Sequence, residues 1–278
     1  MLTRRQWLAA AAVPQWPDIA TIKPDLVTPP MTLGDPRPGA RARQTLDAWR
    51  GSGVYHALYL PPDWTPRKRL PVIVEYAGNG NYSNRYGDVS TGVPEGSHLG
   101  YGISGGRGFV WICVPYIDSA SGRNQTLWWG DADATALYCR QAVQLVCGEY
   151  GGDPRRVVLS GFSRGAIACN YIGLRDGEIA RLWRAFVCYS HYDGVRTWPY
   201  AGSDRESALE RLQRLGNRPQ FICHEQSVED TRRYLLSTGI QGNWDFHAVP
   251  FRNHNDRWVL RDTPLRRRLR RWIRDAIG

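Results

Sequence analysis

Residues 156–168 read R-V-V-L-S-G-F-S-R-G-A-I-A, and this stretch decides the fold. A short apolar run rich in valine precedes Ser163, and small residues that suit a helix follow it. The chain must therefore turn sharply from strand to helix at Ser163, and the backbone of such a corner is strained. Gly161 and Gly165 stand two residues to either side, where side chains would crowd the turn. The pattern predicts that the Ser163 hydroxyl is presented at the tip of the corner as a candidate nucleophile.

The same G-x-S-x-G pattern occurs a second time, at residues 102–106, and its flanks are different. Residues 98–101 show no strand pattern, and the strand-like residues 109–112 follow the serine instead of preceding it. The order is loop and then strand, so we predict a flexible glycine loop over residues 100–108. On this interpretation Ser104 is not a nucleophile.

The composition is that of an ordinary globular protein. The 278 residues are 42% apolar and 22% charged, which is enough for one large core, so we expect a single domain over residues 41–278. Residues 14–40 contain seven prolines and no periodicity, which predicts an extended segment that lies over the domain or trails from it. Residues 41–49 are a candidate short helix. No apolar run approaches the roughly 18 residues needed to cross a bilayer, so no transmembrane segment is expected.

A net charge of +10 raises the question of an anionic partner. Much of the excess lies in residues 266–274, where arginines alternate with apolar residues at helical spacing. This spacing predicts a helix with one core face and a solvated basic face, which accounts for the charge more simply than a ligand does. No nucleic-acid motif accompanies it, so we expect no nucleic-acid partner. An anionic surface or partner is the weaker alternative.

The N-terminal residues 1–13 resemble a twin-arginine export signal. Residues 3–8 read T-R-R-Q-W-L, and alanines follow. This predicts export to the periplasm or the medium.

The six cysteines lie in apolar runs or on predicted helices and lack metal-type spacing, so we interpret them as small buried hydrophobic residues. One disulfide is compatible with this pattern, but a disulfide framework is not.

From residue 53 onward, strand and helix patterns alternate along the chain. Strands are predicted at 54–60, 70–76, 109–115, 157–160, 185–190, 220–224 and 244–250, and helices at 131–150, 164–174, 205–215, 228–237 and the arginine-rich C-terminus. This alternation predicts an α/β fold with a mostly parallel central sheet and helices on both faces.

The corner at residues 161–165, the strand–helix units after it and a late histidine resemble the α/β-hydrolase superfamily over residues 53–278. Residues 150–157, Y-G-G-D-P-R-R-V, are similar to the corresponding stretch in secreted esterases and polyester-depolymerase-like members. The resemblance implies an α/β-hydrolase fold and a Ser–His–acid triad.

The superfamily order places the catalytic histidine after the last strand. His254 stands there, directly after the predicted strand 244–250. A serine hydroxyl is a poor nucleophile until a neighbouring imidazole accepts its proton, so His254 is the expected general base. The other five histidines precede the corner, lie within a strand or stand at earlier strand ends.

The resemblance leaves the acid of the triad open. Glu225 directly follows the predicted strand 220–224, but the family's usual G-x-x-D signature is absent. Gln226 and Ser227 stand where an aspartate might be expected. Asp193, at the end of the preceding strand, is the main rival to Glu225. Asp230 is more simply explained as part of a capping box that opens a helix.

Negative charge that develops on an ester carbonyl oxygen needs fixed N–H donors. The resemblance assigns one of these donors to the backbone of Arg164 and the other to the loop after the strand 70–76, where we choose Asn79.

Three tryptophans, Trp128, Trp129 and Trp198, fall in connections near the expected catalytic edge and could stack on sugars or aromatic acyl groups. The long polar stretch 81–108 is expected to shape the pocket.

These observations together predict an exported serine hydrolase that cleaves carboxylic esters, with Ser163, His254 and Glu225 as its triad. The substrate would be a small-molecule or carbohydrate-linked ester, and no cofactor or metal would be needed. An acyltransferase and a serine peptidase use the same triad and stay open, as does a catalytically silent binding protein. The sequence does not choose among ester substrates.

Overall fold

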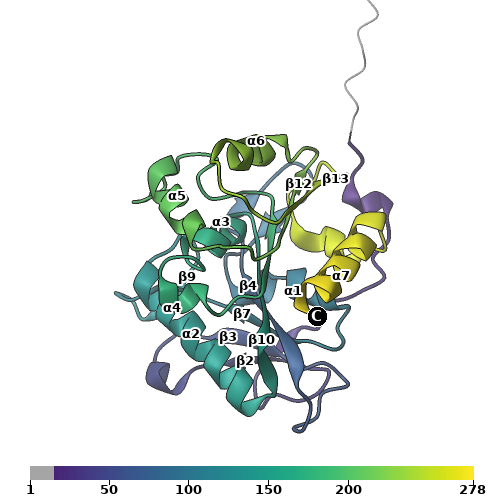
Figure 1. The fold of residues 1–278 in the computed structure, drawn as a ribbon. Coiled ribbons are helices and arrows are strands. Elements are labelled where there is room, and N and C mark those ends of the chain that lie inside the picture. The colour runs from purple at the N-terminus through teal and green to yellow at the C-terminus, as the bar shows by residue number, and fades with distance from the viewer. Residues whose placement is uncertain (1–15) are drawn as a thin grey trace, which may run out of the picture.

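The computed structural model describes residues 16–278, so the export-signal prediction for residues 1–13 lies outside the described part. At its centre is a nine-stranded sheet with the order β1-β2-β3-β7-β4-β10-β11-β12-β13 (Figure 1). Its strands are β1 (Met31–Thr32), β2 (Arg41–Gln44), β3 (His56–Tyr59), β4 (Leu70–Tyr76), β7 (Val110–Val114), β10 (Gly152–Phe162), β11 (Ala185–Tyr189), β12 (Gln220–Glu225) and β13 (Trp244–Val249). From β7 to β13 all neighbours are parallel, whereas β3 is antiparallel to both β2 and β7.

Helices cover both faces of this sheet, which confirms the predicted α/β architecture (Figure 1). One face carries α1 (Leu99–Ser104) and α7 (Pro264–Ile277). The other carries α2 (Ala132–Glu149), α3 (Arg164–Tyr171), α4 (Gly177–Ala180), α5 (Arg205–Gln213) and α6 (Glu229–Ser237). Two small antiparallel hairpins lie outside the main sheet: β5 (Tyr82–Ser83) with β6 (Val89–Ser90), and β8 (Tyr116–Asp118) with β9 (Arg123–Gln125).

The central strands are apolar on both sides because each side packs against helices. All seven residues of β4 are buried. Val72 and Val74 belong to the core under α2 and α3, whereas Ile73 belongs to the core under α1 and α7. Alternate residues of a strand point to opposite faces, so a continuous apolar run is what a strand covered on both sides requires.

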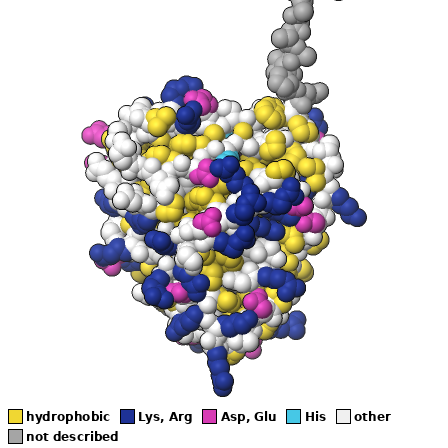
Figure 2. All heavy atoms as spheres, turned by 45° about the vertical axis from the view of Figure 1, so that its right-hand side comes forward, with side chains coloured by type: hydrophobic (Ala, Val, Ile, Leu, Met, Phe, Trp, Pro, Cys, Tyr) yellow, Lys and Arg dark blue, Asp and Glu magenta, His cyan; other side chains and the backbone are white. Residues whose placement is uncertain are grey.

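The C-terminal helix α7 has the predicted division of faces, with one exception. Leu269, Ile273 and Ile277 are buried in the core, and most of the arginines of α7 reach solvent. Figure 2 shows the basic side chains gathered on the face of the molecule that α7 occupies. The exception is Arg266, whose side chain is 2% exposed and pairs with Asp25. No helix within residues 16–278 combines the length and the apolar character that a membrane crossing requires.

Two local predictions were wrong. Residues 99–104 form the helix α1 instead of a flexible loop, and the Ser104 hydroxyl donates a hydrogen bond to the Gly100 carbonyl (2.8 Å). Its glycines serve close packing: a Cβ on Gly100 would lie 2.1 Å from the ring of Trp111. The proposed helix at residues 41–49 is instead strand β2 followed by a 3-10 turn, Asp47–Trp49, because β2 pairs with β3.

Residues 16–30 form an extended segment that lies against the domain, on the side of α7. Ile19 is buried in the core beneath α7, and the backbone N–H groups of Asp25 and Leu26 donate to the Leu260 carbonyl. Asp18 pairs with Arg252 at 2.7 Å. The six cysteines, all within the described residues, are unpaired.

Candidate active site

Ser163 lies at the corner where β10 ends and α3 begins. Its backbone has φ 55° and ψ −116°, a region that non-glycine residues rarely adopt. A Cβ on Gly161 would lie 2.0 Å from the carbonyl oxygen of Gly165, and a Cβ on Gly165 would lie 2.0 Å from that of Tyr76. These neighbours are backbone atoms, so only glycine fits at both positions. The strand–turn–helix order predicted around Ser163 is present.

The structure brings Ser163, His254 and Glu225 together. His254 Nε2 lies 3.1 Å from Ser163 Oγ, and His254 Nδ1 lies 2.9 Å from Glu225 Oε1. Glu225 is the last residue of β12, and His254 stands in the loop after β13, the neighbouring strand. Ser190 Oγ, just past the end of β11, lies 3.1 Å from the same Nδ1. In this arrangement Glu225 accepts a hydrogen bond from the Nδ1–H group of His254. Nε2 is then unprotonated and can accept a proton from Ser163.

Glu225 is ionised at neutral pH although its residue is only 8% exposed. Burial acts to raise the pKa of Glu225, but the hydrogen bond with His254 and the electrostatic attraction of the His254 and His224 imidazoles lower it to about 2. His224 Nδ1 lies 3.2 Å from the second carboxylate oxygen. The carboxylate is therefore available to steady a positive charge on His254.

The structure does not bring the two alternative acids to His254. Asp193 is buried and forms a two-point ion pair with Arg211, at 2.8 and 3.1 Å. Burial raises the pKa of Asp193 to about 6, and Arg211 opposes that rise. The Asp230 side chain is 71% exposed and lies 3.7 Å from Arg233. The capping box proposed for Asp230 does not form: Val228 is the N-cap residue of α6 in place of Ser227, and the Ser227 backbone N–H donates to the Glu225 carbonyl instead of to Asp230.

The two expected oxyanion donors come from the residue after Ser163 and from the loop after β4. Arg164 is the first residue of α3, where a backbone N–H has no partner within the helix. Asn79 follows β4, and its side-chain oxygen accepts a hydrogen bond from the Trp128 backbone (2.8 Å). Both residues line the same cavity as Ser163. Gly78 is confined as well, since a Cβ there would lie 2.8 Å from Ser90 Oγ.

The side chain of Arg164 has a structural role that the sequence did not reveal. Its guanidinium is buried over the ring of Tyr116, at 3.8 Å from the ring centre. It donates hydrogen bonds to the carbonyls of Gly78, Gly92 and Trp128. Burial lowers the pKa of Arg164 to about 10, so the group stays charged at neutral pH. One cation therefore ties three loops around the cavity together.

Asp88 is a second residue that the sequence analysis missed. It is 2% exposed, and it accepts a hydrogen bond from the backbone N–H of His254 (2.8 Å). It also accepts from the side-chain amides of Asn253 and Asn255. These partners stand more than 160 positions away along the chain, so no local pattern marks Asp88. Its carboxylate holds the loop that carries the imidazole.

Ser163 opens into a cavity of about 450 Å³. Leu127, Ile167, Trp128 and Trp198 supply apolar walls, and the two indole rings lie 5.4 Å apart. Trp128 and Trp198 therefore lie near the catalytic edge, where the sequence analysis expected them. Trp129 is instead buried and stacks on Tyr171. Within residues 16–278 no three His, Cys, Asp or Glu side chains are grouped so as to hold a metal ion.

The chain is similar to known proteins in structure but not detectably in sequence. No protein-family model and no curated protein sequence matches the chain. A fungal esterase from Rhizomucor miehei is 14% identical, with a TM-score of 0.56 over 92% of this chain and 85% of the esterase. S-formylglutathione hydrolase from Agrobacterium tumefaciens is 13% identical, with a TM-score of 0.57 over 85% and 94%.

A protein from Bacteroides ovatus, assigned as a dipeptidyl aminopeptidase IV, is 16% identical with a TM-score of 0.57 over 85% of this chain. The chain spans 36% of that protein and 62% of a thermostable esterase that it also resembles. At such identities the likeness concerns the fold. Together with the order of the strands and the corner at Ser163, it shows that the chain has the α/β-hydrolase fold.

Proposed function

We propose that the protein is a serine hydrolase that cleaves carboxylic esters through an acyl-enzyme on Ser163. One observation carries the proposal: the Ser163 hydroxyl, at a strained corner facing a cavity, lies 3.1 Å from an imidazole whose other nitrogen meets a buried carboxylate. This is the geometry in which a serine oxygen becomes nucleophilic at neutral pH.

In the proposed reaction Ser163 Oγ attacks the ester carbonyl carbon while its proton passes to His254 Nε2. The carbonyl oxygen becomes an oxyanion, which the backbone N–H groups of Arg164 and Asn79 bind. The C–O bond to the alcohol then breaks, and His254 returns its proton to the leaving alcohol. Water repeats the sequence: His254 accepts a proton from it, the hydroxide attacks the acyl-enzyme, and the carboxylic acid and free Ser163 result.

The walls of the cavity favour an ester with a flat apolar part. Trp128 and Trp198 offer ring faces that stack on a sugar ring or an aromatic acyl group. Esters attached to carbohydrates are therefore a reasonable first class of substrate to test. The pocket has room for such a group, because cavities of a few hundred Å³ are typical of small-molecule sites.

A fluorophosphonate probe tests the nucleophile directly. We expect covalent labelling of the wild-type protein, loss of labelling in Ser163→Ala, and unchanged labelling in Ser104→Ala. Ser104 is the matched control because it has the same G-x-S-x-G surroundings, while its hydroxyl is bonded within α1. A folded wild-type protein that the probe does not label would refute the proposal and favour a binding protein of the same fold.

Hydrolysis of p-nitrophenyl esters, acetylated sugars and feruloylated sugars then tests the reaction. We expect turnover of at least one ester class and its loss in Ser163→Ala, by a factor on the order of 10⁵. Turnover of peptides but of no ester would replace the esterase proposal with a peptidase.

We further propose that the protein is exported. The support is the T-R-R-Q-W-L stretch at residues 3–8. Replacing Arg4 and Arg5 by lysine should retain the protein in the cytoplasm of a bacterial host, whereas the unaltered chain should reach the periplasm. Equal distribution of the two proteins would refute export by this route.

A further inference from the structure

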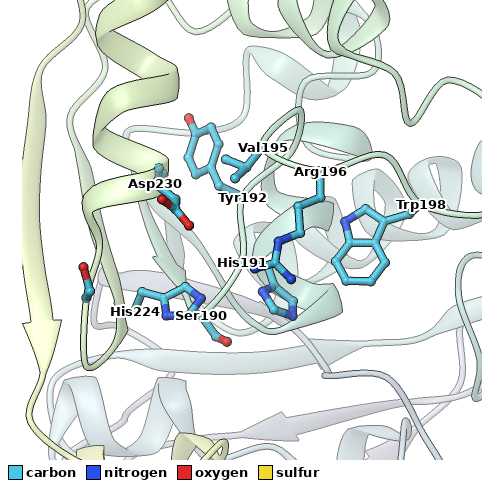
Figure 3. A pocket seen from close by; sticks show the side chains of 10 residues that line it. Ser190, His191, Tyr192, Val195, Arg196, Trp198, His224 and Asp230 are labelled. Carbon is cyan, nitrogen blue, oxygen red and sulfur yellow. The ribbon is translucent and has the colours of Figure 1, made fainter. Parts of the chain in front are cut away.

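A smaller pocket adjoins the active-site cavity and shares His191 and Trp198 with it. Its volume is about 60 Å³, which admits a few water-sized groups but no ring. Figure 3 shows its lining: His191, Arg196 and Trp198 come from the loop after β11, and His224 and Asp230 face them from the end of β12 and the start of α6.

Arg196 brings a positive charge to this pocket. Arg196 is exposed, and within residues 16–278 no carboxylate lies within ion-pair distance of its guanidinium, whereas the buried guanidiniums of Arg211 and Arg266 each pair with an aspartate. Figure 3 shows the Arg196 side chain running beside Trp198, with its guanidinium directed toward His191. The His191 ring lies 5.5 Å from the ring of His254. The His191 ring therefore lies between the Arg196 guanidinium and the catalytic imidazole of His254.

The remaining groups of the pocket do not cancel this charge. Asp230 is mostly exposed, and its carboxylate faces Arg233 at 3.7 Å. Burial, and to a smaller extent the nearby imidazole of His254, lower the pKa of His191 to about 4, so His191 is neutral at neutral pH. The hydroxyls of Ser190 and Ser227 add polar lining. A small anionic group thus meets the Arg196 guanidinium beside the imidazoles and hydroxyls of the lining, while the exposed Asp230 carboxylate lies next to Arg233.

We infer that this pocket binds a carboxylate of the substrate, so that the preferred ester carries a negative charge a few bonds from its scissile carbonyl. The inference rests on the proposed function. A guanidinium binds a carboxylate through two parallel hydrogen bonds, which fix its position as well as its charge. Held in this way, the carboxylate positions the neighbouring ester over Ser163. Half esters of dicarboxylic acids and acylated hydroxy or sugar acids have this form.

Matched esters test the preference. On the acid side, p-nitrophenyl hemisuccinate is compared with its neutral methyl ester. On the alcohol side, 4-acetoxybenzoate is compared with its methyl ester. We expect the anionic member of at least one pair to have a kcat/KM about tenfold or more above that of its neutral partner. Arg196→Gln should remove this preference and leave the neutral esters almost unchanged.

Arg184→Gln is the matched control, because Arg184 is exposed and precedes β11, at the opposite edge of the sheet. It removes the same charge from the molecule and should preserve the preference. Equal kcat/KM values within both pairs, or an equal loss for both members in Arg196→Gln, would overturn the inference.

A binding measurement separates this inference from the proposed function. Calorimetry on Ser163→Ala, with glutarate and neutral dimethyl glutarate as probes, does not depend on turnover. We expect glutarate alone to bind, and the added Arg196→Gln change to abolish binding where Arg184→Gln does not. If no ester is hydrolysed but glutarate binds through Arg196, the proposed function fails and the anion site stands. If glutarate does not bind, the anion site fails.

Discussion

The strained residues of the molecule gather at one place. Five residues other than glycine have positive φ within residues 16–278, and each belongs to or adjoins the candidate site: Asn81, Trp128, Ser163, Ser190 and Gln226. The first three line the cavity, Ser190 contacts His254, and Gln226 follows Glu225. Such conformations cost about 1 to 3 kcal/mol each and persist where the surroundings fix them. Their grouping supports a functional site independently of the triad distances.

The two buried carboxylates of Glu225 and Asp193 are expected to have different roles, Glu225 in catalysis and Asp193 in stability. Glu225→Gln keeps the shape of the side chain but loses the charge that stabilises protonated His254, so we expect kcat to fall about 10⁴-fold with the fold intact. Asp193→Asn leaves the buried Arg211 without its partner, so we expect a loss of about 3 kcal/mol in unfolding free energy. Its activity per folded molecule should be kept. Steady-state kinetics and urea unfolding of both variants measure this, and an Asp193→Asn protein that is stable but inactive would reverse the assignment.

The pKa of Glu225 makes part of the stability dependent on pH. This pKa is lowered from 4.5 to about 2 in the folded protein, so the folded state binds fewer protons than the unfolded state between these values. The stabilisation is complete above about pH 4.5 and is lost as the pH falls toward 2. We expect the stability advantage of wild type over Glu225→Gln to shrink by roughly 2 kcal/mol between pH 6 and pH 3. An advantage that is constant over this range in urea unfolding would contradict the role given to the carboxylate.

At the scale of elements, loops fastened to one another carry the site. Asp88 stands at the hairpin of β5 and β6 and binds the loop that carries His254, while Arg164 binds the carbonyls of three further loops. Neither side chain needs to touch substrate in order to affect the reaction. Each sets the position of groups that do, and a displacement of about 1 Å near reacting atoms can cost on the order of 100-fold in rate.

Asp88→Ala tests this positioning role. It removes the acceptor for the His254 backbone and for three asparagine side chains, so we expect kcat to fall between roughly 10- and 100-fold with little change in KM. The same change in a His254→Ala background should cost stability but almost no further activity, because positioning matters only when the imidazole is present. Additive losses of activity in the double variant would show that Asp88 acts by a route other than His254.

The limits of sequence reasoning are clearest at these loops. The corner at Ser163 and the late His254 are predictable because each is defined by its neighbours along the chain: a strand, a glycine pair, a final strand. Glu225 could be named but not separated from Asp193, since that choice depends on Arg211, which lies 18 positions further along the chain. Asp88 could not be found, because the partners that connect it to the site, Asn253, His254 and Asn255, lie more than 160 positions further along the chain. The helix α1 was mistaken for a loop because its glycines indicate flexibility in sequence but serve close packing against Trp111.

At the scale of the whole molecule, the N-terminal segment 16–30 is fastened near the site and on α7. Near the site, the Ile19 N–H donates to Asn253 (2.7 Å), whose side chain in turn binds Asp88. On α7, Asp25 meets the buried Arg266 through two hydrogen bonds of 2.6 Å each. The segment thus supports the loop of His254 from outside and supplies the closer of the two carboxylates that pair with the buried Arg266.

The two carboxylates that face Arg266 allow the brace to be tested. Asp25 makes the close two-point pair, whereas Asp262 reaches Arg266 at 3.3 Å and is 55% exposed. We therefore expect Asp25→Asn to lower the unfolding free energy by about 2 kcal/mol and Asp262→Asn by less than about 1 kcal/mol. The activity of Asp25→Asn should persist because the contact of Ile19 with Asn253 is untouched. Urea unfolding measures the stability of both variants, and ester kinetics measures their activity. Equal losses of unfolding free energy in the two variants would contradict the stabilising role given to the Asp25–Arg266 pair.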